Sequence, residues 1–265
     1  MNEGRRRRSA KQRRRDARRA GTGRRKDDNE DFLTQLVRKA LAKHPLYLLS
    51  LAAYIIATVT LDRYAFPTSE RKESLSLENV VISLAGRRCR ETTALLAVLA
   101  ELLVDDEVLR DRCREEVAAR NDHLPKWIVG LPQVEVYRAV RRTHVLGDGD
   151  ELAVGARLAG GTELTVAVYV DHNELSSAQT IAVLDGSIAT LMADVSRNID
   201  PDTSYVDVSL ADARAWIDQG LTKAGFLLHP DPWRESLPLV KWLVAQLPEG
   251  GTGRQGPDLD DEVVS

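Results

Sequence analysis

The spacing of hydrophobic residues changes along this chain, from intervals of three and four residues in its first part to an alternation of two in its middle. Helical spacing predicts an amphipathic helix over residues 32–41 and two more over about 90–104 and 106–121. Residues 45–61 are apolar almost throughout, with a proline in the first turn, and predict a further helix that is hydrophobic on all sides. The first part of the chain is therefore predicted to be helical.

Alternation begins after Pro132 and predicts a small antiparallel sheet. The expected strands cover residues 134–145, 151–159, 163–170 and 180–184. Glycine-containing turns at 147–150 and 160–161 separate the first three strands, as in β-hairpins. A helix through residues 187–195 follows and can cover one face of the sheet.

Two helices are expected near the C-terminus. Ser209 and Asp212 form a capping-box-like start for a helix that ends near Gly225. Residues 229–235, HPDPWRE, contain two prolines and are expected to break the chain before a last helix over 237–247. Together these patterns predict an α+β fold with an N-terminal helical unit, a small antiparallel sheet, C-terminal helices and disordered ends.

The chain divides by composition as well as by periodicity. We expect a disordered arginine-rich arm, a helical unit, an α+β unit that includes the C-terminal helices, and a disordered acidic tail, over residues 1–26, 27–130, 131–248 and 249–265. Two cysteines are too few for a disulfide scaffold, and 43% hydrophobic residues are too many for a fully disordered chain.

Charge is distributed very unevenly between the arm and the rest of the chain. The net charge of the 265 residues is −3, but residues 1–26 hold 13 basic and two acidic residues, which leaves +11 on the arm and −14 on the remainder. The arm has no aliphatic side chain larger than alanine, so it cannot offset the entropy of folding by burial. A basic arm attached to an acidic body is the clearest functional signal in the sequence.

The arginines of the arm are suited to phosphate groups, because the planar guanidinium matches phosphate oxygens and stacks on bases. We therefore expect nucleic acid, RNA or a ribonucleoprotein above all, to bind at the 13 basic residues of the arm: Arg5, Arg6, Arg7, Arg8, Lys11, Arg13, Arg14, Arg15, Arg18, Arg19, Arg24, Arg25 and Lys26. The alternatives are an acidic protein surface, including this protein's own, and a membrane surface. The acidic body is in turn a possible contact for a protein partner.

A candidate catalytic site lies at the end of the best predicted strand, where Asp171, His172 and Asn173 follow VAVYV. Histidine beside an acid can serve as a general base or bind a metal, which leaves a hydrolase-type enzyme as an alternative function. Adjacent strand residues face opposite sides of a sheet, however, and Asp-His-Asn is also ordinary turn chemistry. The sequence favours a protein that is not an enzyme.

The other motifs in the sequence do not indicate a metal site or a phosphate-binding loop. The histidines lack the HExxH spacing of a zinc enzyme, and the glycine pairs lack the GxxxxGK pattern of a phosphate loop. A metal centre built from His144, His172 and an acid remains one alternative. We expect no metal and no cofactor.

Residues 45–61 raise the alternative of a single membrane span, because 17 apolar residues are at the short limit for crossing a bilayer. The run also contains Ser50, Thr58 and Thr60, and a short apolar helix of this kind is typical of a protein core. We therefore expect a buried helix in a cytoplasmic protein.

Three segments resemble a group of uncharacterised actinobacterial proteins. They are the helix HPLYLLSLAAYIIATV at 44–59, the strand end VYVDHN at 168–173 and the helix SLADARAWI at 209–217. The resemblance implies a bacterial source and an α+β fold, with an N-terminal helical region before the strand and an Ala/Arg-rich helix after it. It implies no activity, cofactor or site residue.

Overall fold

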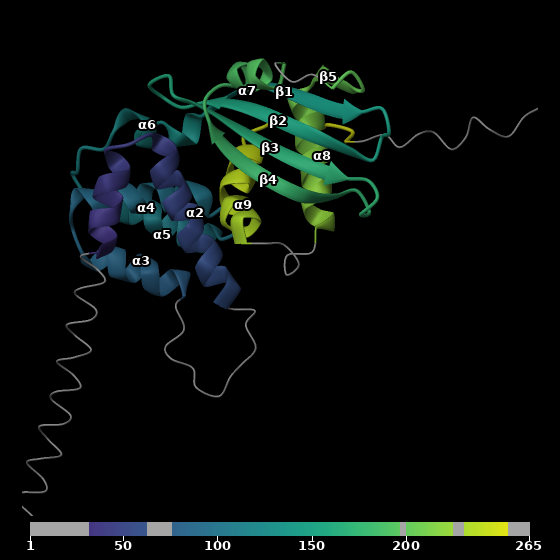
Figure 1. The fold of residues 1–265 in the computed structure, drawn as a ribbon. Coiled ribbons are helices and arrows are strands. Elements are labelled where there is room, and N and C mark those ends of the chain that lie inside the picture. Colours follow the sequence, from purple (N-terminus) through teal and green to yellow (C-terminus); the bar gives the residue numbers. More distant parts are fainter. Residues whose placement is uncertain (1–31, 63–75, 197–199, 225–230, 254–265) are drawn as a thin grey trace, which may run out of the picture.

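Helices form the first part of the chain, an antiparallel sheet the middle, and two long helices the end (Figure 1). This computed structural model describes residues 32–62, 76–196, 200–224 and 231–253. The α+β class expected from the sequence is confirmed. Residues 5–26 of the arm lie outside the described residues, as do residues 254–265 of the tail.

The described N-terminal part begins with a helix over residues 32–41, as predicted. It continues with α2 (Pro45–Asp62), α3 (Leu77–Gly86), α4 (Arg90–Leu102), α5 (Glu107–Ala118), the short α6 (Lys126–Val129) and a single 3₁₀ turn (Leu131–Gln133). Side-chain caps fix where these helices start. The Asp106 carboxylate accepts a hydrogen bond from the Leu109 N–H at the start of α5, and the Ser76 hydroxyl accepts one from the Asn79 N–H at the start of α3.

Helix α2 is a core helix, as expected from the sequence. Leu48, Leu49, Ala52 and Ala53 are completely buried, while Tyr54 is half exposed on the opposite side. Among the described helices, none has the length and hydropathy needed to cross a membrane. The alternative of a membrane span over residues 45–61 is therefore not retained.

The sheet in the described residues has five antiparallel strands in the order β4-β3-β2-β1-β5. The strands are β1 (Glu135–His144), β2 (Gly149–Arg157), β3 (Glu163–Asp171), β4 (Ser177–Asp185) and β5 (Thr203–Val208). Consecutive strands pair as hairpins from β1 to β4, and β5 returns to pair with the free edge of β1. The turns after β1 and β3 consequently lie at the same end of the sheet.

The two faces of the sheet are covered differently. Leu152 and Val154 on β2 belong to the main core, on the face covered by α8 (Leu210–Lys223). Ala153 lies between them in sequence and points to the other face, where it packs in a small cluster with Ile188 of α7 (Ile188–Ser196). This alternation is the period of two that the sequence predicted.

The C-terminal helices begin differently from each other. Ser209 caps α8 as predicted, because its hydroxyl oxygen accepts a hydrogen bond from the Asp212 N–H at 3.1 Å. Helix α9 covers Asp231–Val244 and contains Pro238, so the prediction that residues 231–235 break the chain is wrong. Pro232 falls in the first turn of α9, where a proline costs no hydrogen bond.

Helix α9 lies between the sheet and the N-terminal helices (Figure 1). It packs on α2 from the first part of the chain and on β4 from the middle, and its Trp242 is completely buried. One cluster of buried side chains runs from Val37 through the sheet to Leu247. Segments far apart in sequence therefore share a core.

Two elements with clear geometry were not predicted. Helix α3 follows a Ser76 cap, and its Val81 and Leu84 are buried. Strand β5 is short and lies at an edge of the sheet with Val206 exposed. The last described residues, 249–253, contact α8: the Glu249 carboxylate pairs with Arg214 at 3.0 Å.

Candidate functional site

The sequence candidates Asp171, His172 and Asn173 lie at the end of β3 and in the turn that follows it. The Asp171 carboxylate accepts a hydrogen bond from the Asn173 N–H at 2.8 Å, which is turn chemistry. Asn173 is exposed. The carboxylate that meets His172 belongs to Asp150 on β2 instead, with 2.8 Å between His172 Nε2 and Asp150 Oδ2.

Asp150 is the centre of a buried polar network beneath the end of the sheet. Its side chain is 2% exposed. The Thr143 hydroxyl donates to Asp150 Oδ1 at 2.5 Å, and Arg141 Nε donates to the same oxygen at 3.0 Å. The guanidinium of Arg141 in turn lies 4.9 Å from the ring centroid of Trp216 on α8. Three strands and one helix thus hold this carboxylate in place.

Two opposing effects set the pKa of Asp150. Burial raises it, and hydrogen bonds from Thr143, His172 and Arg141 together lower it by more, so the pKa lies below the ordinary value for an aspartate. The carboxylate is therefore ionised at neutral pH and acts only as a hydrogen-bond acceptor.

This acceptor determines which nitrogen of His172 holds the proton. Because Asp150 can only accept, Nε2 of His172 donates to it, and in the neutral ring Nδ1 is then a lone-pair acceptor. The hydroxyl of Ser176 lies 3.2 Å from Nδ1 and is positioned to donate to it. The result is a chain of hydrogen bonds from Ser176 through His172 to Asp150.

Sequence reasoning identified His172 but missed both of its partners. Asp150 pairs with Val170 across the β2–β3 ladder, two residues from His172 along β3. Reading that neighbourhood from the sequence requires the strand register, which the hairpin turns did not fix. Ser176 could have been found from its place four residues after His172 in the same short connection.

His144 does not join His172 in the metal centre that the sequence left as an alternative. Ligand atoms of His144, Asp200 and Asp202 lie within 4.8 Å of one another. His144 Nδ1 already accepts a hydrogen bond from the Leu146 N–H at 3.2 Å, so its Nε2 holds the proton and faces Asp200 at 3.5 Å. A proton at Nε2 is at odds with metal binding through that nitrogen.

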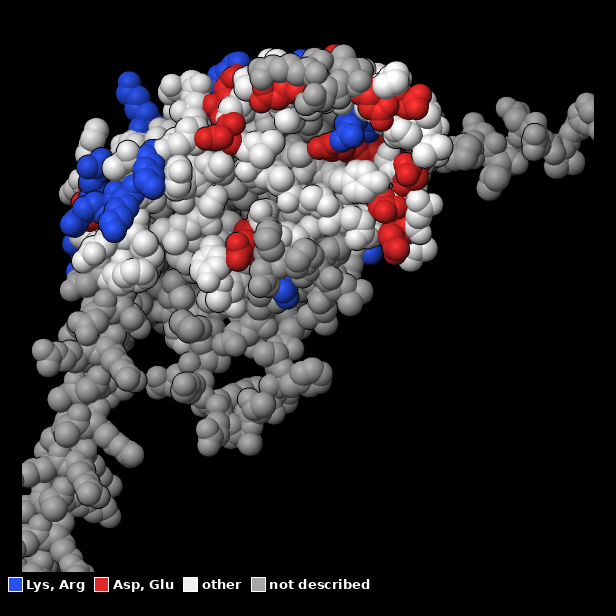
Figure 2. All heavy atoms as spheres, in the orientation of Figure 1, with Lys and Arg blue, Asp and Glu red and all other residues white. Residues whose placement is uncertain are grey.

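A second candidate region is a basic surface formed by the first helices. It consists of six exposed residues, which we call the basic face: Arg38, Lys39, Lys43, Arg88, Arg90 and Lys126. Figure 2 shows Lys and Arg side chains gathered over the helix of residues 32–41, which residues 27–31 separate from the arm in sequence. Arg38 Nε donates to Glu91 at 2.7 Å and so connects this helix to the start of α4.

An open hollow of about 840 Å³ lies beside the basic face. Its rim includes Arg90, His123 and Lys126, together with Asp122. The Asp122 carboxylate accepts a hydrogen bond from the Thr93 hydroxyl at 2.6 Å, so one of its oxygens is already occupied. Two exposed basic side chains, Arg90 and Lys126, and the Asp122 carboxylate thus line the hollow.

Arg120 forms the floor of this hollow and ties three helices together. Its side chain is 2% exposed and pairs with Glu116 at 2.9 Å. It donates to the hydroxyls of Thr92 and Thr93 at the start of α4, each at 3.0 Å. It also donates to the Leu84 carbonyl at the end of α3, at 3.1 Å. Its donors are occupied within the protein, so its role is structural.

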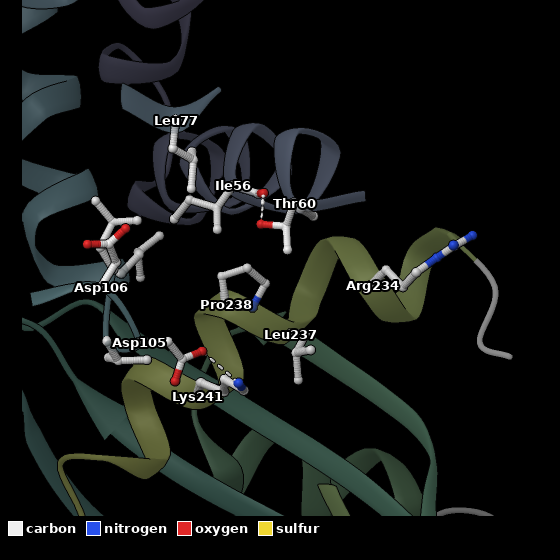
Figure 3. Close-up of a pocket in the computed structure, with 13 residues that line it drawn as sticks. Ile56, Thr60, Leu77, Asp105, Asp106, Arg234, Leu237, Pro238 and Lys241 are labelled. Carbon is white, nitrogen blue, oxygen red and sulfur yellow. Dashed lines mark hydrogen bonds and ion pairs between the residues drawn. The ribbon is translucent and has the colours of Figure 1, made fainter. Parts of the chain in front are cut away.

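Another hollow, of about 400 Å³, lies between α2 and α9 (Figure 3). Ile56, Leu77 and Leu237 give it apolar walls. Its polar groups already have partners: Lys241 Nζ donates to Asp105 at 2.7 Å, and the Thr60 hydroxyl donates to the Ile56 carbonyl. Few polar groups remain to orient a small molecule there.

Comparisons with known proteins do not identify a family for this chain. No family model, no curated protein and no solved structure matches the chain. The resemblance to actinobacterial proteins stays a prediction, and function must be argued from the residues.

Proposed function

We propose that the protein binds nucleic acid, preferentially RNA or a ribonucleoprotein, through contacts to phosphates. The basic residues of the arm, from Arg5 to Lys26, make the main contacts, and the basic face extends them onto the folded body. The observation that supports this proposal is the position of the basic face. Two of its residues, Arg38 and Lys39, lie on the helix of residues 32–41, which only residues 27–31 separate from the arm, so both can contact one polyanion.

The chemistry of the basic face suits a phosphate backbone. Exposed lysines and arginines neutralise phosphates and release condensed counterions, which is the main source of affinity that is independent of nucleotide sequence. Lys39 lies on the helix of residues 32–41 and Lys43 in the turn that follows it, and both side chains are exposed. Arg90 and Lys126 both line the hollow, which we expect to admit a bent single strand.

Acidic residues at the opposite end of the molecule also favour binding of a polyanion at the basic face. The turns at the far end of the sheet present Asp148, Glu174, Asp200 and Asp202, all exposed, and Figure 2 shows acidic side chains gathered there. A negatively charged strand is repelled from this end and attracted to the basic face. The acidic end remains available to a protein partner.

The test is a salt titration of binding to a short single-stranded RNA and to duplex DNA, by fluorescence anisotropy. Deleting residues 1–26 removes 13 basic residues and should abolish measurable binding. In the full chain, Lys39→Gln with Lys43→Gln should weaken binding and make the slope of log K against log salt less steep by about 0.7 per lost contact on single strands.

Lys223→Gln is the matched control, because Lys223 is an exposed lysine at the end of α8, outside the basic face. It should leave both affinity and slope unchanged. Undiminished binding after the arm deletion would overturn the proposal for the arm. Equal slopes for the Lys39/Lys43 variant and the unaltered protein would show that the basic face does not contact the nucleic acid.

A further inference from the structure

The turn between β3 and β4 has a backbone that its residues do not favour. The Ser177 N–H donates to the Glu174 carbonyl at 3.0 Å, which closes a four-residue turn. Its central residues, Leu175 and Ser176, have φ angles of 59° and 55°. A turn with positive φ at both central positions is of type I′, where Asn-Gly is the preferred pair.

Among the described residues, Leu175 and Ser176 are the only ones other than glycine with positive φ. Such a conformation costs free energy for a side chain with a Cβ, and it persists only where the surrounding structure holds it. Here it places the Ser176 hydroxyl 3.2 Å from Nδ1 of His172. Strained residues of this kind are often found at catalytic sites, which makes the turn a candidate for one.

We propose that Ser176 is a nucleophile, with His172 as its general base, in a site that hydrolyses uncharged carboxylic esters. Ser176 remains partly exposed, whereas His172 is 9% exposed and is held from below by Asp150. Asp150 acts as a positioning residue, since it touches His172 and not the substrate. The proposal is independent of nucleic-acid binding, which uses the opposite end of the molecule.

The reaction follows from the hydrogen-bond chain. His172 Nδ1 takes the hydroxyl proton as Ser176 Oγ adds to the ester carbonyl carbon, and Asp150 stabilises the imidazolium that forms. The carbon–oxygen bond to the alcohol then breaks, and His172 returns the proton to the departing alkoxide. Water next adds to the acyl carbon and gives a proton to Nδ1. The bond to Oγ breaks, and the proton returns to Ser176 as the carboxylic acid leaves.

The neighbouring side chains indicate the substrate class. Val145, Leu146 and Leu175 are 72%, 75% and 83% exposed, which is unusual for residues of their size. The His172 N–H donates to the Asp148 carbonyl at 2.8 Å and so holds the β1–β2 turn beside the β3–β4 turn. These apolar side chains can contact an acyl chain next to Ser176.

The charge around the β3–β4 turn narrows the class of substrate further. Asp148, Asp171 and Glu174 surround the turn, and none of residues 144–150 or 171–177 is Lys or Arg. Anionic esters, including phosphate esters, are repelled by such a surface. An uncharged ester with a short apolar acyl group fits both the charge and the exposed side chains.

The test uses the full chain with p-nitrophenyl butyrate, with p-nitrophenyl phosphate as the anionic comparison, and with a fluorophosphonate label read by peptide mass spectrometry. The label should attach to Ser176, and only the butyrate should be hydrolysed. His172→Gln should lower the rate at least about 100-fold, the low end of what a general base contributes. Asp150→Asn should lower kcat with little change in KM.

Ser176→Gly makes the test independent of folding. Glycine accepts positive φ without strain, so this variant should fold at least as well as the unaltered protein, as measured by thermal denaturation. It should nevertheless lose both hydrolysis and labelling, whereas Ser50→Ala, at an exposed position on α2, should keep both. Hydrolysis that survives in Ser176→Gly, or an unaltered protein that neither reacts with the label nor hydrolyses the ester, would overturn the proposal.

Discussion

At the scale of single residues, one buried arginine does more for the helical part than its place in the sequence suggests. Arg120 follows the end of α5 in a stretch of mixed charge, where a solvated side chain is the ordinary expectation. Its guanidinium instead binds Glu116, the start of α4 and the end of α3. Five N–H donors in a fixed fork allow one side chain to bind a carboxylate, two hydroxyls and helix-end carbonyls at once.

Replacing Arg120 should therefore destabilise the protein strongly. Arg120→Met keeps most of the side-chain volume but removes the guanidinium that binds the Leu84 and Ala85 carbonyls and the Glu116 carboxylate. We expect the free energy of unfolding to fall by roughly 3 kcal/mol, the low end for breaking a buried ion pair. Urea denaturation followed by circular dichroism measures it.

Arg112→Met serves as the comparison for this prediction. Arg112 is also on α5, but its side chain is 46% exposed and its pair with Glu78 spans 3.5 Å. A surface pair of this kind contributes less than about 0.5 kcal/mol. Similar losses in the two variants would show that Arg120 does not tie the helices together.

At the scale of elements, close approach between α8 and the sheet depends on a residue without a side chain. A Cβ added at Gly220 would lie 3.1 Å from Val170 Cγ2 on β3 and 3.6 Å from Ala178 Cβ on β4. Gly220 thus brings the helix onto two strands at once. A glycine inside a helix otherwise costs about 1 kcal/mol relative to alanine, so its packing role offsets a poor propensity.

A larger side chain at this position should separate the helix from the sheet. Gly220→Leu is expected to lower the free energy of unfolding by about 1–3 kcal/mol through overpacking. Gly86→Ala should have the opposite sign, because a Cβ added at Gly86 meets nothing within 4 Å and alanine favours the last turn of α3. Thermal denaturation of both variants measures the change in stability. A stabilised Gly220→Leu variant would contradict this account of the packing.

The helices and strands also show which parts of the fold could be predicted from the sequence. Hydrophobic spacing was enough for α4 and the four hairpin strands, and an apolar run was enough for α2, because each of these elements buries many of its own residues. It failed for β5, which alternates only weakly and takes its place by pairing with β1. Helix α9 was placed too late because Pro230 and Pro232 indicated a break, whereas Pro232 lies in the first turn of the helix, where a proline is tolerated.

The candidate site was predictable to the same limited extent. His172 could be identified because it stands at the end of the best strand. Its contact with Asp150 depends on the register between β2 and β3, and the contact of Arg141 with Trp216 depends on which face α8 covers. Both are tertiary facts that local patterns do not contain.

At the scale of the whole molecule, the face drawn in Figure 2 has Lys and Arg side chains gathered over the first helices and acidic side chains gathered at the turns of the sheet. The acidic residues of the chain then compete with nucleic acid for the arm, and weak binding at physiological salt reflects that competition as well as the site itself. The C-terminal residues 254–265 add four acids and one arginine to the competing charge.

Deleting residues 254–265 should strengthen RNA binding. The cut is best made after Gly253, because Glu249 and Thr252 contact α8 and their loss would disturb the fold. Affinity should rise most at low salt, where charges at a distance are least screened. Anisotropy titrations at two salt concentrations measure this, and unchanged affinity at both would show that the two ends of the chain do not communicate.

The contact of α2 with α9 has a consequence for how the protein is made. Ribosomes deliver the chain from its N-terminus, so α2 emerges long before residues 231–244 exist to cover it. The part of α2 that packs on α9 remains uncovered through the synthesis of most of the described chain, and truncation before α9 leaves it so. Helix α9 completes the core that the earlier helices begin, and a chain truncated before it exposes apolar surface of the kind that chaperones bind.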